Sequence, residues 1–258
     1  MSSFSLPRPD LFIAAMGRSG STMLANLFTT PPERWVLVEP RLADASTGRD
    51  VLDQARSFGW DLTDGHWCLA PGEDALQRIH RVFAARLRGL KKWGVKEVRS
   101  ELFGPTINIL RPRQTLVLVR DLRDVAISLH AKIIRDDNPN YDEDWLRGYL
   151  TKTPKAIVDL ARDVEQLDHM TVRYEDLVRD LGVRVKIAQW AEWPLDGAPD
   201  RNLATVFGRG REVALHAGAV TEKALARHQR PDISDGARAI AAWAHDVGRQ
   251  YQQRFGYA

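Results

Sequence analysis

The sequence predicts an α/β protein in which helices cover both faces of a central, mostly parallel sheet. Short apolar runs alternate along the chain with segments whose apolar residues recur at helical spacing. The apolar runs are continuous rather than alternating, as expected of strands that are buried on both faces. With 258 residues, the chain is long enough for one large domain with a substantial core. We therefore expect a single domain over residues 1–258, with residues 1–9 flexible.

Each element is predicted from its local pattern. The strands are expected at Leu11–Met16, Trp35–Val38, Lys92–Val95, Gln114–Val119 and Met170–Val172. The helices are expected at Ser21–Thr29, Glu73–Gly89, Ser100–Leu110, Asp121–Arg135, Asp142–Leu167 with a break at Pro154, Tyr174–Ala191 and Ser234–Phe255. The order of these elements indicates repeated βαβ units, which build a parallel sheet.

The turn after the first strand is the first candidate site. Gly17 and Gly20 allow backbone conformations that other residues resist. A strand, a tight turn and a helix start expose backbone N–H groups, and the helix dipole favours negative charge there. The turn also supplies one cation and three hydroxyl groups, from Arg18, Ser19, Ser21 and Thr22. These residues predict a phosphate site; an ordinary capped helix N-terminus is the alternative.

This turn is not a Walker P-loop, which requires the pattern G-x-x-x-x-G-K-[ST]. No Lys follows Gly20, and no Gly lies five positions before it. The usual Mg-nucleotide site is therefore not expected, although Ser21 and Thr22 could contact a phosphate without a metal. The seven histidines show no metal-ligand spacing, so no metal is expected.

A second candidate site follows the strand Gln114–Val119. Arg120 lies at the carboxyl end of this strand, where ligands bind in open α/β sheets. Ser128 lies eight positions later, about two helical turns into the next helix. An Arg and a Ser placed in this way could hold one phosphate from two sides. The alternative is structural, with Arg120 paired to Asp124 and Ser128 filling a gap.

Together the two segments resemble the nucleotide-binding segments of sulfotransferases that use 3′-phosphoadenosine-5′-phosphosulfate (PAPS). In that family the first segment binds the 5′-phosphosulfate, and the second binds the 3′-phosphate through an Arg and a Ser eight positions apart. Residues 171–178 are similar to the V-R-Y-E-D-L turn common in the family. The resemblance covers residues 11–178 and is thin between residues 41 and 89 and after residue 180.

The resemblance implies a P-loop-NTPase-like sulfotransferase fold, PAPS as cosubstrate, PAP as product and no metal. It implies cosubstrate contacts from Arg18, Ser19, Gly20, Ser21, Thr22, Arg120, Ser128 and Tyr174. The segment 206–213 lies where the family has a late loop over the adenosine, and Arg209 and Arg211 resemble that loop's Arg-Lys-Gly weakly. A flexible basic loop is the alternative for this last segment.

The resemblance also implies catalytic residues. Arg18 matches the P-R-S-G-T-T turn of tyrosylprotein and many bacterial sulfotransferases, whereas cytosolic enzymes have Lys there. Arg cannot donate a proton at neutral pH, but it can neutralise the bridging oxygen as charge develops. Glu39 corresponds to a Glu of tyrosylprotein sulfotransferases and is implied as the general base, with Arg41 orienting it or the acceptor. A surface ion pair at the strand end is the alternative.

The strand that begins at Lys92 ends in Lys96 and Glu97. Cytosolic sulfotransferases have Lys-Thr-His in this region, where the Lys contacts the transferring group and the His is the base. Lys96 retains the Lys, and Val98 stands in place of the His. This substitution supports Glu39 as the base and leaves Glu97 as a second candidate. A solvated strand-end Lys is the alternative for Lys96.

Two polar stretches, residues 42–72 and 135–150, are expected to be inserts. In this family such inserts often line the acceptor pocket, and ordinary surface loops are the alternative. The second stretch is acidic, which could favour a cationic acceptor.

Composition is consistent with a small-molecule enzyme. The 37 basic and 34 acidic residues give a net charge of +3, which suits an anionic cosubstrate and is too weak to indicate nucleic acid. No apolar stretch approaches the length of a membrane span, and the N-terminus lacks the pattern of a signal peptide. Cys68 is the only cysteine, which fits a reducing cytoplasm. We expect a cytoplasmic, bacterial protein without membrane partners, and a homodimer stays open.

The functional hypothesis is sulfuryl transfer from PAPS to a hydroxyl group, less often an amine, of a small molecule. Natural-product tailoring is the expected setting. Three alternatives stay open: a P-loop-like kinase that uses Mg-ATP, a non-catalytic nucleotide-binding protein, and PAPS-independent transfer from an aryl sulfate.

Overall fold

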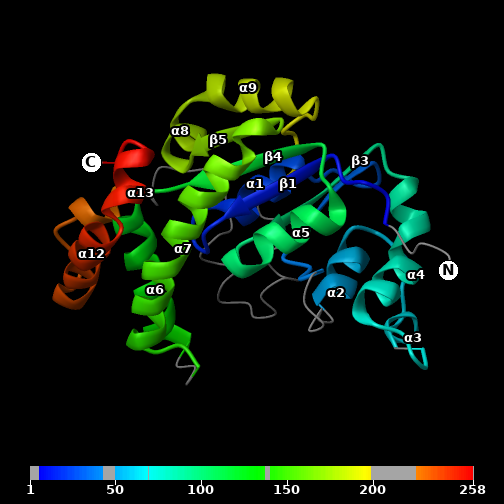
Figure 1. Ribbon diagram of the computed structural model, residues 1–258, viewed down its shortest axis with the longest axis horizontal. Coiled ribbons are helices and arrows are strands. Elements are labelled where there is room, and N and C mark those ends of the chain that lie inside the picture. The colour runs from blue at the N-terminus through cyan, green and yellow to red at the C-terminus, as the bar shows by residue number, and fades with distance from the viewer. Residues whose placement is uncertain (1–5, 43–49, 69, 137–139, 199–224, 258) are drawn as a thin grey trace.

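The computed structural model describes residues 6–42, 50–68, 70–136, 140–198 and 225–257. Within this part of the chain, five strands form one sheet in the order β2-β3-β1-β4-β5, and every neighbouring pair is parallel. The strands are β1 (Leu11–Ala15), β2 (Arg34–Val38), β3 (Lys92–Glu97), β4 (Gln114–Val119) and β5 (His169–Arg173). The fold class expected from the sequence is confirmed (Figure 1).

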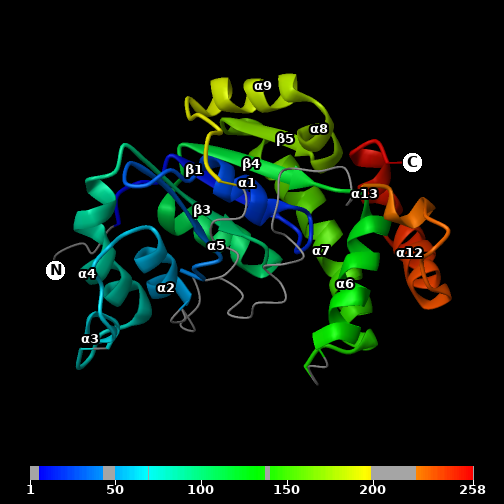
Figure 2. The same cartoon turned by 180° about the vertical axis from the view of Figure 1, so that it is seen from behind.

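Helices cover both faces of the sheet, as Figures 1 and 2 show from opposite sides. One face carries α1 (Ser21–Phe28), α8 (Tyr174–Arg179) and α9 (Leu181–Ala191). The other carries α2 (Asp50–Ser57), α4 (Ala75–Arg88), α5 (Phe103–Leu110), α6 (Leu122–Asp136) and α7 (Glu143–Asp163). The other described helices are α3 (Asp64–Trp67), α12 (Asp235–Val247), α13 (Arg249–Arg254) and the short 3-10 segments η1 (Ser100–Leu102), η2 (Val164–Gln166) and η4 (Arg227–Gln229). None of the helices in these ranges is long and apolar enough to cross a bilayer.

Strand residues alternate between two hydrophobic clusters. Along β1, Phe12 and Ala14 pack in the cluster on the α2–α7 side, whereas Leu11, Ile13 and Ala15 pack in the cluster beneath α1, α8 and α9. All five side chains are at most 1% exposed. This two-sided burial explains the continuous apolar run, because neither face of the strand meets water.

The expectation that residues 42–72 form an irregular insert is wrong for the described part of that stretch. Helices α2 and α3 lie there, and α2 buries three apolar side chains against the core. These helices are short, so their periodicity spans too few turns to stand out from the polar and glycine residues around them. Residues 43–49 lie outside the described residues.

The break expected at Pro154 is also wrong, because α7 continues through this residue. A proline inside a helix removes one hydrogen bond and costs about 3 kcal/mol. Pro154 is buried on the same helix as Leu146, Leu150 and Ile157, and burial of that face offsets the cost. Two other expected helices are instead divided, at Asp180 between α8 and α9 and at Gly248 between α12 and α13.

The start of the described chain is hydrogen-bonded to the segment that precedes β4, an interior strand of the sheet. The amide of Arg113 donates to the carbonyl of Pro9 at 3.0 Å, and the guanidinium of Arg8 donates to the carbonyl of Pro112 at 3.2 Å. Residues 1–5 lie outside the described residues. The flexibility expected for residues 1–9 stays a prediction.

All five strands deliver their carboxyl ends to one edge of the sheet, where ligands bind in parallel α/β folds. The groups at this edge are the turn Gly17–Thr22 after β1, Glu39 after β2, Lys96 in β3, Arg120 after β4 and Tyr174 after β5. The sheet register places Lys96 opposite Val38, the residue before Glu39. The fold therefore gathers the candidate residues from five separate segments.

Candidate active site

The turn after β1 is fixed by contacts on both sides. Gly20 adopts a left-handed conformation with φ 86° and precedes α1. A Cβ at Gly20 would lie 2.2 Å from Cε2 of Tyr174, so only glycine permits this approach. On the other side, the amide of Gly17 donates to the hydroxyl of Tyr149 at 2.7 Å. The hydroxyl of Ser19 donates to the carbonyl of Met16 at 2.6 Å and so stabilises the turn from within.

Replacing Gly20 by Ala is expected to destabilise the fold by about 1–3 kcal/mol, because the new methyl group meets the Tyr174 ring in a backbone conformation already unfavourable to alanine. Urea unfolding measures the loss. Gly59→Ala is the matched control, since Gly59 also has positive φ (103°) but has nothing within 4 Å of the added Cβ. Equal losses in the two variants would show that the Tyr174 contact has no effect.

Arg120 and Ser128 lie together, with Arg18 between them. The guanidinium of Arg120 donates to the carbonyl of Arg18 at 2.7 Å, and Nε of Arg18 donates to the Ser128 hydroxyl at 3.2 Å. Arg120 is only 4% exposed and lies 4.6 Å from the centre of the Tyr174 ring. The ion pair with Asp124 named as the structural alternative is present as well, at 3.8 Å. At 3.8 Å this ion pair is longer than a charge-assisted hydrogen bond.

A further arginine, absent from the sequence-based site, reaches this cluster from η4. Burial lowers the pKa of Arg227, the nearby charge of Arg120 lowers it further, and Asp124 opposes both effects. The Nε atom of Arg227 is enclosed and has no hydrogen-bond partner among the described residues. His228 anchors the segment, because its amide and its Nδ1 lie 3.1 and 2.7 Å from one Asp124 carboxylate oxygen.

The guanidinium groups of Arg18 and Arg120 both reach the first turns of α6, at Ser128 and Asp124, and Arg227 of η4 lies near enough for the charges of Arg120 and Asp124 to shift its pKa. Like charges brought together in a partly buried place are unfavourable unless an anion is added. We name Arg18, Arg120 and Arg227 the arginine cluster. The basic run at residues 227–230 was the sequence signal that could have predicted Arg227. Arg209 and Arg211 were selected from the sequence instead. Arg209 and Arg211 lie outside the described residues.

Lys96 joins the turn to the end of β2. Its side chain is 1% exposed, and its ammonium contacts the carboxylate of Glu39 and the hydroxyl of Thr22, the latter at 3.2 Å. The Glu39 side chain is 22% exposed. A buried ammonium requires a partner, which Glu39 supplies while its carboxylate still reaches the surface. The solvated Lys96 of the alternative interpretation is not observed.

Glu39 is held in an uncommon backbone conformation. Glu39 and Arg41 have positive φ angles of 50° and 51°, as does Arg18 with 67°. Gln54 of α2 fixes the preceding residue, Val38, by hydrogen bonds of 2.8 and 2.7 Å to its amide and carbonyl. Non-glycine residues in this conformation cost about 1–3 kcal/mol and concentrate at functional sites. The strain therefore coincides with three of the residues selected from the sequence.

Glu97, the second candidate base, faces its own turn. Its Oε1 accepts hydrogen bonds from the amides of Val98 at 2.9 Å and Arg99 at 3.1 Å, and the residue is 1% exposed. Burial raises the pKa of Glu97, and the negative charge of Glu39 raises it further. These contacts give Glu97 a structural role in the turn after β3.

Glu97→Gln is expected to stabilise the protein at about pH 7 and to have no effect near pH 4. Because the pKa is raised, the folded protein holds the proton more tightly than the unfolded chain. Stability that is present below the ordinary value of 4.5 is therefore lost as the pH rises through the raised pKa. Gln cannot ionise but keeps the accepting oxygen. Urea unfolding at the two pH values measures the difference, and a variant less stable than the wild type at pH 7 would contradict it.

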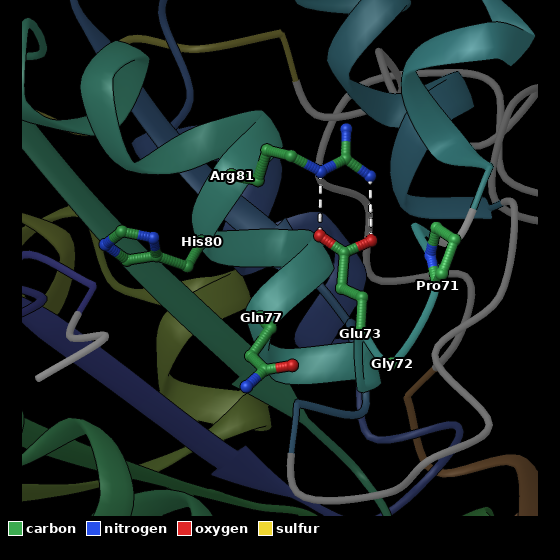
Figure 3. Close-up of a pocket in the computed structure, with 6 residues that line it drawn as sticks. All are labelled: Pro71, Gly72, Glu73, Gln77, His80 and Arg81. Atoms are coloured by element: carbon green, nitrogen blue, oxygen red, sulfur yellow. Dashed lines mark hydrogen bonds and ion pairs between the residues drawn. The ribbon is translucent and has the colours of Figure 1, made fainter. Parts of the chain in front are cut away.

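A separate surface pocket lies at the start of α4 and is shown in Figure 3. Its lining residues are Pro71, Gly72, Glu73, Gln77, His80 and Arg81. The carboxylate of Glu73 accepts two hydrogen bonds from Arg81, at 2.7 and 2.9 Å, and these lower the pKa of Glu73 to about 2. Glu73 also accepts the amide of Ala70 at 3.0 Å, so its interactions stabilise the helix start. Across the described ranges, no group of three or more His, Cys, Asp or Glu side chains is arranged to hold a metal ion.

Comparison with known proteins agrees with this geometry. A family model described as "Sulfotransferase family" matches residues 9–196.

The chain belongs to the sulfotransferase family.

Solved structures show that the fold is that of sulfotransferases. The sulfotransferase domain of the olefin synthase from Synechococcus PCC 7002 has a TM-score of 0.58 and 18% identity, covering 96% of this chain and 95% of that domain. The sulfotransferase domain of the curacin biosynthetic pathway has a TM-score of 0.61 and 15% identity, covering 93% and 98%. A comparison with curated protein sequences gave no match.

Proposed function

We propose that this sulfotransferase transfers a sulfuryl group from PAPS to a hydroxyl group of a small-molecule acceptor. The observation that carries the proposal is the arginine cluster, which lies beside a glycine-containing turn at the carboxyl edge of the sheet. PAPS carries two separate anionic groups, and this edge offers two cationic places for them. The turn with Arg18 suits the 5′-phosphosulfate, and Arg120, Ser128 and Arg227 suit the 3′-phosphate.

Tyr174 contacts both of these proposed anion sites. Its ring lies against Gly20 of the turn and beneath the guanidinium of Arg120. Contacts from the hydroxyl groups of Ser21 and Thr22 remain predictions, as do those from Arg209 and Arg211 in the segment outside the described residues. An aryl sulfate has only one anionic group, so no anion would bind at the Arg120 side of the arginine cluster. This difference favours PAPS over an aryl sulfate as the donor.

In the proposed mechanism, Glu39 is the general base and accepts the hydroxyl proton of the acceptor as the new O–S bond forms. The bond between sulfur and the phosphate oxygen breaks, and its electron pair stays on that oxygen. Lys96 and Arg18 stabilise the resulting negative charge. The Lys96–Glu39 contact supports these roles because it brings an acid–base group and a cation to the same point beside the turn. Arg41 orients Glu39 or the acceptor.

Thermal stabilisation by PAP, compared with Mg-ATP, tests the proposal. A ligand at about 100 times its dissociation constant stabilises a protein by about 2.7 kcal/mol, which raises the Tm by roughly 5–10 °C at this size. We expect PAP to give this shift and radiolabelled PAPS to transfer sulfate to a hydroxyl acceptor. A shift with Mg-ATP alone would favour the kinase, and PAP binding without any transfer would favour a non-catalytic protein.

The biological setting follows from the same proposal. Two structurally similar domains come from an olefin synthase and from a biosynthetic pathway, which supports natural-product tailoring. A bacterial source and a cytoplasmic location remain predictions. Transfer to an amine and assembly as a homodimer remain predictions.

A further inference from the structure

Helix α13 holds the residues that follow β4, although the two segments are 131 positions apart in the chain (Figures 1 and 2). The amide of Arg120 donates to the hydroxyl of Tyr251 at 3.0 Å, and that hydroxyl donates to the carbonyl of Arg120 at 2.9 Å. The side chain of Gln252 accepts the amide of Leu122 at 3.3 Å and donates to the carboxylate of Asp121 at 3.2 Å. Two neighbouring side chains of α13 therefore fix the start of the β4–α6 connection.

The hydroxyl of Tyr251 sets the direction in which the Arg120 side chain leaves the backbone. It engages the peptide groups on both sides of the Arg120 Cα atom. Tyr251 is 1% exposed, and its ring packs against Phe255 and Tyr257, with ring centres 4.9 and 6.4 Å away. Burial raises the pKa of the Tyr251 hydroxyl, so it keeps the proton that it donates. Removing this hydroxyl would take a partner from two buried backbone groups at once.

The side chain of Arg120 carries this positioning to the anion site. Its guanidinium donates to the carbonyl of Arg18 at 2.7 Å and lies 4.6 Å from the centre of the Tyr174 ring. Both contacts require the guanidinium to point toward the turn after β1. The contacts of Tyr251 and Arg120 therefore form one continuous connection from α13 to that turn.

We propose that Tyr251, supported by Gln252, is a positioning residue for the cosubstrate, because it holds Arg120 where the guanidinium meets the 3′-phosphate of PAPS. This inference rests on the proposed function, since it concerns the same anion site. Tyr251 acts through Arg120 and not on the ligand itself. Loss of its hydroxyl should weaken a ligand that has a 3′-phosphate and spare one that has none.

Calorimetric titration of Tyr251→Phe with PAP and with adenosine 5′-monophosphate (AMP) tests the inference. AMP lacks the 3′-phosphate and reports the rest of the site. We expect PAP to bind about ten-fold more weakly than to the wild type, and the affinity for AMP to stay within about two-fold. A merely structural role would weaken both ligands alike. Unchanged PAP affinity, or equal weakening of both ligands, would overturn the inference.

Thr29→Val is the matched control for the loss of a buried hydroxyl. The hydroxyl of Thr29 also accepts a backbone amide, from Val36 at 3.1 Å, and donates to a backbone carbonyl, of Ala25 at 2.9 Å. Thr29 is fully buried and follows the end of α1, whereas the turn after β1 precedes this helix. The variant should keep the wild-type ratio of PAP to AMP affinity. A fall in this ratio as large as that in Tyr251→Phe would overturn the inference.

Two further variants test the route of the effect. In the Arg120→Ala background, Tyr251→Phe should cause no additional loss of PAP affinity, because its effect passes through Arg120. A further loss of about ten-fold in that background would overturn the inference. Gln252→Met leaves the Tyr251 hydroxyl in place and should weaken PAP by about three-fold without affecting AMP. Equal weakening of both ligands in this variant would contradict the role of Gln252.

The wild type separates failure of this inference from failure of the proposed function. A wild-type protein that binds PAP no more tightly than AMP would overturn both together, because no 3′-phosphate site would then exist. A wild-type preference for PAP that Tyr251→Phe retains in full would overturn this inference alone.

Discussion

Glu39→Gln is expected to lower the rate of sulfuryl transfer about 10²–10⁴-fold while PAP binding is retained. The amide has the size of the carboxylate but cannot accept the acceptor proton. Glu39 is also the partner of the buried Lys96 ammonium, so the variant leaves that charge without its counter-ion and should lose about 3–5 kcal/mol of stability. Single-turnover rates measured well below the lowered Tm separate the chemical effect from the loss of stability.

Glu97→Gln is the control for this experiment because it removes the other candidate base. Glu97 accepts amides of its own turn and should retain transfer close to the wild-type rate after replacement. A rate loss in Glu97→Gln together with normal transfer in Glu39→Gln would reverse the assignment of the base. Lys96→Ala should lower the rate by about 10²–10³-fold, since a charge placed at the developing phosphate anion is then missing.

Arg120→Ala is expected to weaken PAP binding about 10²–10³-fold and to abolish the PAP-dependent rise in Tm at ligand concentrations that saturate the wild type. Arg120 is buried, and its guanidinium also holds the carbonyl of Arg18. The replacement therefore removes one cation of the arginine cluster and loosens the turn. Calorimetric titration with PAP measures the loss directly, and Arg120→Lys should be intermediate, because it keeps the charge but not the planar fork.

Arg123→Ala is the matched control for Arg120. Arg123 is also an arginine near the start of α6, but it pairs with Asp121 at 2.7 Å and takes no part in the arginine cluster. PAP affinity should be unchanged in that variant and about ten-fold weaker in Arg227→Ala. Unchanged affinity in Arg120→Ala would contradict the assignment of the arginine cluster to the 3′-phosphate.

Much of the fold follows from local pattern. The runs that form β1 and β4 are apolar without interruption, and the polar groups that matter follow directly after them. Because parallel strands end at the same edge, the sequence alone predicts that the turn Gly17–Thr22 and Arg120 meet. Some helices could not be predicted accurately from the sequence. Helix α2 has too few turns to show a clear period, and α7 continues through Pro154 because its buried face packs well.

The sequence by itself determined the fold class, the turn after β1, the spacing of Arg120 and Ser128, and the choice of Glu39 and Lys96 as candidates. The first three depend on residues close together in the chain, where periodicity and strand ends carry the information, whereas the resemblance to sulfotransferases implied Glu39 and Lys96. Tertiary structure alone decided that Arg227 joins the arginine cluster, that Lys96 binds Glu39, and that Tyr149 contacts Gly17 from 132 positions away. Such pairs are set by how distant helices pack against the sheet, and no local pattern of charge or hydrophobicity specifies them.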